Sequence, residues 1–181
     1  MKLILASVSP RRRELLSALC EFELQPSRFD ETGEGSAEQV VLLNARGKAK
    51  EVFSRFPGCT VLGADTVVAL DGKILGKPKD EEDAKRMLRM LSGRVHSVFT
   101  GVCLVDENGV IERVVETKVL FKTLSEKFIE EYVLSGTPMD KAGAYGIQDG
   151  LVVASYEGSY SNVMGLPMEA VEEMLKVKGH V

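Results

Sequence analysis

The chain has 181 residues, of which 44% are hydrophobic and 28% charged, which is typical of a soluble globular protein with a sizeable core. Its 27 acidic and 23 basic residues give a net charge of −4, which argues against a general nucleic-acid-binding protein but leaves room for a local basic pocket. No apolar stretch approaches membrane-spanning length and the run at 3–6 is too short for a signal peptide, so we expect a cytoplasmic protein with one domain at 1–181.

The first half of the chain alternates between strand and helix signals. In chain order we expect a strand at 3–6, a helix from Pro10 after a Ser9 N-cap, a strand at 21–25, a polar loop at 26–35 and a helix from the Ser36 capping box to about 56. An apolar strand at 60–64 follows and ends at Asp65, with a further strand at 67–70, a hairpin turn at 71–72 and a return strand at 74–75.

The second half continues the pattern with longer strands. A helix is expected from the Asp80 cap to about 91, then strands at 95–105 and 110–120 joined by a hairpin turn at 106–109. A helix from Ser125 to about 136, a loop at 137–148, a strand at 151–156, a loop at 157–166 and a helix from Pro167 to about 178 complete the chain. This order predicts an α/β fold with a mixed β-sheet, flanking helices and two lobes around a central cleft.

The N-terminal turn carries an unusual concentration of cations. Three arginines, from Arg11 to Arg13, fall in the first turn of a helix, where the helix dipole disfavours positive charge. A bound anion would offset this cost. The hydroxyls of Ser7 and Ser9, the free N–H groups of the helix and the guanidinium groups could together bind a polyanion, although a solvated basic turn would show the same pattern.

Cysteine and histidine are too few and too scattered for several familiar catalytic centres. Cys20, Cys59 and Cys103 each lie in or beside an apolar run, so we expect reduced core thiols. His96 begins a strand-like run and is expected to be structural, whereas His180 is expected to fray. The composition argues against a Cys/His zinc site and a Ser-His-Asp triad, so any catalysis would use carboxylates, lysines, arginines and hydroxyls.

Two carboxylates and two lysines are candidates for phosphate chemistry. Asp65 directly follows an apolar strand, a place where α/β folds put ligand groups, and Glu31 lies in an irregular loop. Together they would supply two oxygen ligands for Mg²⁺ or Mn²⁺, although a turn aspartate and a solvated glutamate would look the same. Lys77 lies on a Gly-Lys-Pro turn and could contact phosphate or be merely exposed. Lys48 could face the cleft, but the pattern favours the solvent-exposed side of its helix.

The loop at 140–148 combines glycines, an aromatic ring and the amide of Gln148, which could read the edge of a base. A rigid structural loop explains the same residues equally well. Asn162 precedes a helix that starts with proline and is interpreted as a cap or turn residue.

Five motifs together resemble the Maf family of nucleoside triphosphate pyrophosphatases, which is named for a septum-formation phenotype. They are Ser-x-Ser-Pro-Arg-Arg at 7–12, Ala-Asp-Thr-Val-Val at 64–68, Gly-Lys-Pro at 76–78, Asp-Lys-Ala-Gly-Ala-Tyr-Gly-Ile-Gln at 140–148 and Asn-Val-Met-Gly-Leu-Pro at 162–167. The resemblance covers nearly the whole chain in order. It implies a mixed α/β fold similar to inosine-triphosphate pyrophosphatases, an active site in the cleft between two lobes, and a homodimer.

The resemblance also implies roles for individual residues. Asp65 matches the proposed catalytic acid, and Arg11, Thr66 and Gln148 match positions associated with the branch that acts on dTTP and UTP. The remaining polar family positions correspond to Ser7, Ser9, Arg12, Glu31, Lys48, Lys77, Asp140 and Lys141. Arg13 occupies a variable family position and is left out of the site.

The sequence therefore predicts hydrolysis of a pyrimidine nucleoside triphosphate to the monophosphate and pyrophosphate. Mg²⁺ or Mn²⁺ held by Asp65 and Glu31 would assist water attack on the α-phosphorus, with neither a membrane nor a nucleic acid as partner. A nucleotide-binding regulator of cell division with little turnover, and a phosphatase that releases orthophosphate, remain alternatives.

Overall fold

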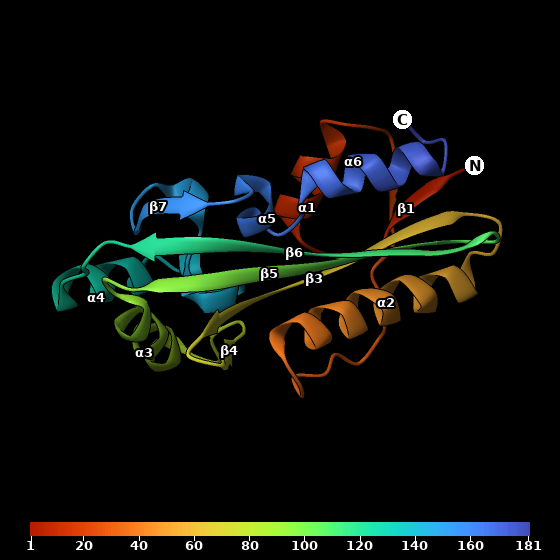
Figure 1. Ribbon diagram of the computed structural model, residues 1–181. Helices are drawn as coiled ribbons and strands as arrows, with labels where there is room; N and C mark the ends of the chain where they lie inside the picture. The colour runs from red at the N-terminus through yellow and green to blue at the C-terminus, as the bar shows by residue number, and fades with distance from the viewer.

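One open, mixed sheet of seven strands runs through the computed structural model, which describes residues 1–181 (Figure 1). The strands are β1 (Leu3–Leu5), β2 (Glu23–Leu24), β3 (Thr60–Leu70), β4 (Lys73–Leu75), β5 (Val95–Asp106), β6 (Gly109–Phe121) and β7 (Val153–Glu157). Their order is β2-β1-β3-β5-β6-β7, with β4 paired to β3. β1 is parallel to β2 and β3, and every other pair is antiparallel. The expected α/β fold with a mixed sheet is confirmed.

Helices cover both faces of the sheet (Figure 1). They are α1 (Pro10–Ser17), α2 (Ala37–Arg55), α3 (Glu81–Leu91), α4 (Glu126–Leu134), α5 (Tyr160–Met164) and α6 (Met168–Val177). The long helix α2 lies along one face, and α1 and α6 lie on the other. α3 and α4 pack together near the open end of the long β5–β6 hairpin, opposite its turn. None of these helices is long and apolar enough to cross a membrane.

Local sequence signals explain how the helices begin. The Ser36 hydroxyl accepts from the backbone N–H of Gln39, whose side chain accepts in turn from the backbone N–H of Ser36, so the expected capping box starts α2. Asp80 and Ser125 likewise cap α3 and α4 through their side chains. Pro167 is the N-cap of α6 rather than its first helical residue, because the helix starts at Met168.

The hydrophobic core follows the alternation of the strands. In β1, Leu3 and Leu5 pack with residues of α1 and α6, whereas Ile4 packs with residues of α2 on the opposite face. A separate and larger cluster joins α3 and α4 to the other end of the sheet and includes Leu88 and Ile129. The core therefore lies in distinct parts along the sheet, and β3 contributes residues to all of them.

Two glycines allow α2 to approach the sheet closely. A Cβ atom added to Gly63 of β3 would lie 2.3 Å from the carbonyl oxygen of Ala45, and one added to Gly101 of β5 would lie 2.4 Å from that of Val41. Real Cβ atoms do not come this near to backbone oxygens. The two glycines therefore fix the distance between α2 and the strand that carries Asp65.

Several expectations need correction. β3 runs without a break from Thr60 to Leu70, so Asp65 lies inside a strand and does not follow one. The segment 157–166, expected as a loop, contains α5, and 137–149 forms three short 3₁₀ turns. His180 does not fray, since its Nε2 lies 2.8 Å from the hydroxyl of Thr60. All three cysteines are unpaired, but only Cys103 is fully buried in the core.

Candidate active site

The candidate site lies where one edge of β3 has no neighbouring strand. β1 pairs with residues 60–62 of this edge and β4 with residues 68–70, while β5 pairs with the opposite edge from Val61 to Ala69. After β1 the chain turns away through Ser7 and Ser9 into α1. Asp65 and Thr66 therefore occupy a gap in the sheet edge, and their backbone is fixed from the other side.

A cleft of about 740 Å³ opens at this gap. Polar residues from six separate parts of the chain line it, and most were expected at the site from the sequence: Ser7, Ser9, Arg11, Arg12, Glu31, Lys48, Asp65, Thr66, Lys77 and Asp140. Lys141 and Gln148 do not line this cleft. They line a smaller pocket of about 30 Å³, which shares Arg11 and Ala142 with the cleft.

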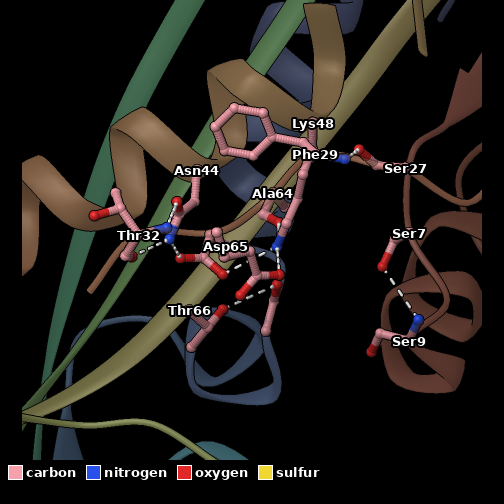
Figure 2. Close-up of polar contacts among 12 residues, drawn as sticks. Ser7, Ser9, Ser27, Phe29, Thr32, Asn44, Lys48, Ala64, Asp65 and Thr66 are labelled. Carbon is pink, nitrogen blue, oxygen red and sulfur yellow. Dashed lines mark hydrogen bonds and ion pairs between the residues drawn. The ribbon is translucent and has the colours of Figure 1, made fainter. Parts of the chain in front are cut away.

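Asp65 is held from two sides (Figure 2). Its Oδ1 lies 3.1 Å from the ammonium nitrogen of Lys48, and its Oδ2 accepts a hydrogen bond of 2.9 Å from the amide of Asn44. Asp65 is only 7% exposed, and Lys48 only 8%. Lys48 also donates to the carbonyl oxygen of Ala64 at 3.3 Å. The sequence pattern favoured the wet side of α2 for Lys48, and this interpretation is wrong because the side chain turns into the gap beside β3.

Glu31 approaches the same lysine from the loop before α2. Its Oε1 lies 2.7 Å from Lys48 Nζ, so one ammonium group bridges Glu31 and Asp65. Burial raises the pKa of the Glu31 carboxyl, but the hydrogen bond and charge of Lys48, with the charges of Lys77 and Arg12, outweigh burial and hold that pKa below its usual value. Both carboxyl groups therefore face one point in the cleft, the Lys48 ammonium.

Asn44 is a buried polar residue that the sequence reasoning missed. It is 2% exposed, and its amide contacts both Asp65 and the backbone of Thr32. A usable signal was present in the sequence. Asn44 stands four residues before Lys48 in a helix, which puts the two side chains on one face, and asparagine is a poor helix former that otherwise has little reason to be there.

The N-terminal turn is ordered by its own hydroxyls. Ser7 Oγ accepts from the backbone N–H of Ser9 at 3.1 Å, and Ser9 Oγ accepts from that of Arg12 at 3.4 Å, which caps α1. The first turn of α1 contains no acidic residue to balance its arginines. Of the three cations of this turn, Arg11 and Arg12 line the cleft and Arg13 does not.

Arg11 and Arg12 reach in different directions. Arg12 donates from Nε to the carbonyl oxygen of Gly165 at 2.7 Å and from Nη2 to Thr66 Oγ1 at 3.1 Å. Burial lowers the pKa of this guanidinium, an effect that nearby Asp65 partly offsets. Arg11 instead pairs with Asp140, with Nη1 and Oδ2 3.2 Å apart.

Asp140 also contacts Lys141, with Oδ1 and Nζ 3.0 Å apart. Burial raises the pKa of the Asp140 carboxyl, but Lys141 and Arg11 outweigh burial and hold it below the usual value. Asp140 therefore stands as an anion between two cations, at the border between the cleft and the smaller pocket. Lys77 lines the cleft on the side of β4.

Thr66 and Asn162 connect the cleft to the core. The hydroxyls of Thr66 and Thr100 are 2.9 Å apart, and Thr100 Oγ1 donates to the carbonyl oxygen of Asn162 at 3.2 Å. Asn162 is completely buried, and its amide donates to the carbonyl oxygens of Val98 and Val115. Asn162 is therefore a structural residue that holds α5 to the sheet, which brings the carbonyl group of Gly165 to Arg12.

The residues present fit a divalent metal that binds together with substrate. No three His, Cys, Asp or Glu side chains gather closely enough to hold an ion by themselves. Glu31 and Asp65 nevertheless converge on one cation, the Lys48 ammonium, and two carboxylates completed by substrate phosphates are a usual setting for Mg²⁺. A metal at this point would require Lys48 to move toward the substrate.

A mixed α/β fold with a buried acid in a cation-lined cleft is the architecture of an enzyme that acts on a polyanionic substrate. Comparison with known proteins agrees. The family model described as Maf-like protein matches residues 2–178, so the chain belongs to this family.

Curated relatives cover almost the full chain. It is 51% identical to a protein of Thermococcus gammatolerans named dTTP/UTP pyrophosphatase, over 93% of this chain and 92% of the relative. Proteins of the same name from Pyrococcus abyssi and Geobacillus sp. (strain WCH70) are 48% and 49% identical, over 97% and 98% of this chain and 95% and 98% of the relatives.

Proposed function

We propose that this protein hydrolyses dTTP and UTP to the nucleoside monophosphate and pyrophosphate. The observation that carries the proposal is the placement of Asp65 in the same cleft as Arg11, Arg12, Lys48 and Lys77, four cations that can face a triphosphate. The names of relatives about 50% identical over nearly the full chain support the choice of nucleotides.

Binding begins with the triphosphate. The guanidinium groups of Arg11 and Arg12, the ammonium of Lys77 and the N–H groups at the start of α1 can neutralise and orient its oxygens. The hydroxyls of Ser7 and Ser9 add donors on the same turn. When bound at Glu31 and Asp65, Mg²⁺ or Mn²⁺ would neutralise further phosphate charge and hold the chain of phosphates in place.

The chemical step is water attack on the α-phosphorus. A bond forms between the water oxygen and the α-phosphorus while the bond to the oxygen that bridges the α- and β-phosphorus atoms breaks. Asp65 takes the proton from the water and the departing pyrophosphate takes the electron pair. Arg12 and Lys77 stabilise the charge that develops on this leaving group, more strongly in the transition state than in the ground state.

Base selection falls to the pocket beside the cleft, which must widen from its volume of about 30 Å³ to admit a pyrimidine ring. Its walls include Val98, Tyr145 and Met164, with the amide of Gln148 at the edge. Uracil and thymine present two carbonyl acceptors on either side of one N–H donor. A carboxamide can donate to a carbonyl oxygen of the base and accept from its N–H group. We propose that Gln148 reads this edge, while Thr66 and Arg11 fix the position of the sugar and α-phosphate between the two cavities.

A nucleotide panel tests the function. The protein is incubated with dTTP, UTP, dCTP, CTP, dGTP and dATP in the presence of Mg²⁺ or Mn²⁺, and both products are identified. We expect monophosphate and pyrophosphate from dTTP and UTP at rates well above the others, with oxygen from labelled water in the monophosphate. Diphosphate and orthophosphate would indicate a phosphatase. Tight binding without turnover would indicate a nucleotide-binding regulator of cell division.

We also propose that the protein works as a cytoplasmic homodimer of single-domain chains, with no nucleic acid or membrane as partner. The acidic net charge supports the exclusion of nucleic acid, since such a partner requires an excess of basic residues on a surface. Light scattering during gel filtration measures the mass of the particle. A mass near 19.8 kDa would contradict the dimer.

A further inference from the structure

We propose that Asn44 is a positioning residue, which fixes the orientation of the Asp65 carboxylate and ties the Glu31 loop to the same point. This inference rests on the proposed function, because it assigns Asp65 the role of base. It concerns a residue that touches neither phosphate nor base and acts entirely through its neighbours.

The orientation of the Asn44 amide follows from its contacts with the backbone. Its Oδ1 accepts from the N–H of Thr32 at 2.9 Å, and its Nδ2 donates to the carbonyl oxygen of Thr32, also at 2.9 Å. If the amide were flipped, its NH₂ group would face the N–H of Thr32 and its oxygen would face the carbonyl oxygen of Thr32, so both hydrogen bonds would be lost. The NH₂ group therefore must face Asp65, where its second hydrogen meets Oδ2 at 2.9 Å.

This contact makes the two oxygens of Asp65 unequal. Oδ2 is held by a donor that is 2% exposed and cannot leave, because Asn44 is anchored to Thr32. Oδ1 contacts Lys48, whose long side chain also reaches Glu31 and can move when the substrate brings its own charges. Oδ1 is thus the oxygen that Asp65 presents to water or to a metal when Lys48 moves, and the neutral donor on Oδ2 holds the carboxylate in this orientation.

The same amide positions the second carboxylate. Glu31 immediately precedes Thr32, so the two hydrogen bonds of Asn44 hold the loop before α2 against the helix next to the acid (Figure 2). Glu31 then meets the same Lys48 ammonium that Asp65 contacts. One side chain therefore sets the separation of the two groups that are proposed to share a metal.

Asn44→Asp is the informative variant, because it replaces the NH₂ donor with an oxygen of nearly equal size. An oxygen acceptor would then face Asp65 Oδ2 where the parent protein has a donor at 2.9 Å, and the hydrogen bond that orients the carboxylate would be lost. We expect turnover of dTTP at pH 7 to fall 10- to 100-fold. We expect this loss to appear in kcat, with KM for dTTP within about threefold of the parent value.

Asn108→Asp is the matched control, since it makes the same change in the β5–β6 hairpin turn, far from the cleft. Its kcat and KM for dTTP should equal those of the parent protein. A loss in Asn44→Asp that appears only in KM, or an unchanged rate, would overturn the proposal.

Asn44→Ala gives a second test that does not depend on how well Asn44→Asp folds. It should lower kcat 10- to 100-fold and leave KM for dTTP within about threefold, because the substrate contacts remain. A loss confined to KM would overturn the proposal. Lack of turnover by the parent protein with every nucleotide would instead refute the proposed function, so the two failures are distinguishable.

Discussion

Arg12 Nη2 lies 3.1 Å from Thr66 Oγ1, which joins the N-terminal turn to the strand position next to Asp65. The same guanidinium also donates to the carbonyl oxygen of Gly165. Three of the sequence motifs, which are far apart in the chain, therefore meet at one side chain. Because a guanidinium is a planar fork with fixed donors, it can make both contacts and still present an N–H group to a phosphate.

Replacement of Arg12 by lysine should break this junction while keeping the charge. A single ammonium group cannot reach Gly165 and Thr66 in the same geometry, so we expect kcat/KM for dTTP to fall at least tenfold and stability to fall by about 1 kcal/mol. Steady-state kinetics and urea unfolding measure the two effects. Arg13→Lys, in the neighbouring position that is left out of the site, is the control, and equal losses in both variants would contradict the role of Arg12.

Asp65→Asn should nearly abolish turnover. An amide cannot accept the proton from water, so we expect a loss of about three orders of magnitude or more in kcat, as for other proton acceptors whose function is removed. The change in volume is minimal and Lys48 keeps Glu31 as a partner, so the melting temperature should shift by only a few degrees. Activity near that of the parent would show that another group is the base.

Gln148→Glu should change selectivity more than stability. A carboxylate has no donor for the carbonyl oxygens of uracil or thymine, so turnover of dTTP and UTP should fall at least tenfold relative to that of the other nucleotides in the panel. Gln25→Glu, on β2's side of the molecule, is the matched control and should leave the ratios unchanged. If Gln148→Glu keeps the ratios of the parent, the smaller pocket does not select the base.

His96 should make the fold sensitive to mild acid. Burial lowers the pKa of its imidazole from 6.5 to about 4, and Phe121 and Tyr145 pack their rings against it. Since the unfolded chain binds this proton more readily, its contribution to stability is intact above pH 6.5 and is lost as the pH falls toward 4. We expect about 2 kcal/mol less stability at pH 5 than at pH 7 from this residue.

Urea unfolding of the parent protein and of His96→Gln at the two pH values isolates the contribution of His96 to the free energy of unfolding. Glutamine can still contact the Tyr145 hydroxyl, which lies 2.7 Å from His96 Nε2, but it does not titrate. The stability difference between pH 5 and pH 7 should shrink by about 2 kcal/mol in the variant. Identical pH dependence in both proteins would mean that His96 does not remain neutral.

Gly101→Ala should be strongly destabilising, because the new Cβ would lie 2.4 Å from the carbonyl oxygen of Val41 and α2 would have to move away from the sheet. Overpacking of this kind costs about 1–3 kcal/mol or more. Gly33→Ala is the control, since nothing lies within 4 Å of its added Cβ. Equal melting temperatures for the two variants would contradict the close approach of α2 to β5.

Sequence patterns predicted the element order well, because most helices carry a capping side chain and both hairpins carry Asp or Gly in the turn. They failed where burial removes the alternation. β3 is buried on both faces almost throughout, so its pattern predicts strand before and after Asp65 but does not show that the two stretches form one strand. The helix α5 was missed for another reason, since five residues between a serine cap and Gly165 are too few to show a helical period.

The motifs predicted which polar residues would be candidates, but they could not predict what those residues contact. Lys48 was interpreted as solvated because helical spacing alone does not say which neighbours a long side chain reaches. The burial of Asn44 could not be predicted from the sequence for the same reason. Both depend on how closely α2 lies to β3, which is set by Gly63 and Gly101, two glycines without any local turn signal.

The uninterrupted course of β3 has a consequence for how the cleft can work. The backbone that carries Asp65 is paired with β5 from Val61 to Ala69, so the strand cannot move the acid toward a nucleotide or away from a larger one. Any adjustment to the size of the nucleotide must come from the 26–35 loop and the 137–149 turns. These segments border the cleft and are not hydrogen-bonded into the sheet. Amide protons of β3 should accordingly exchange with deuterium far more slowly than those of residues 26–35 and 137–149. Added nucleotide should slow the exchange only in these two segments.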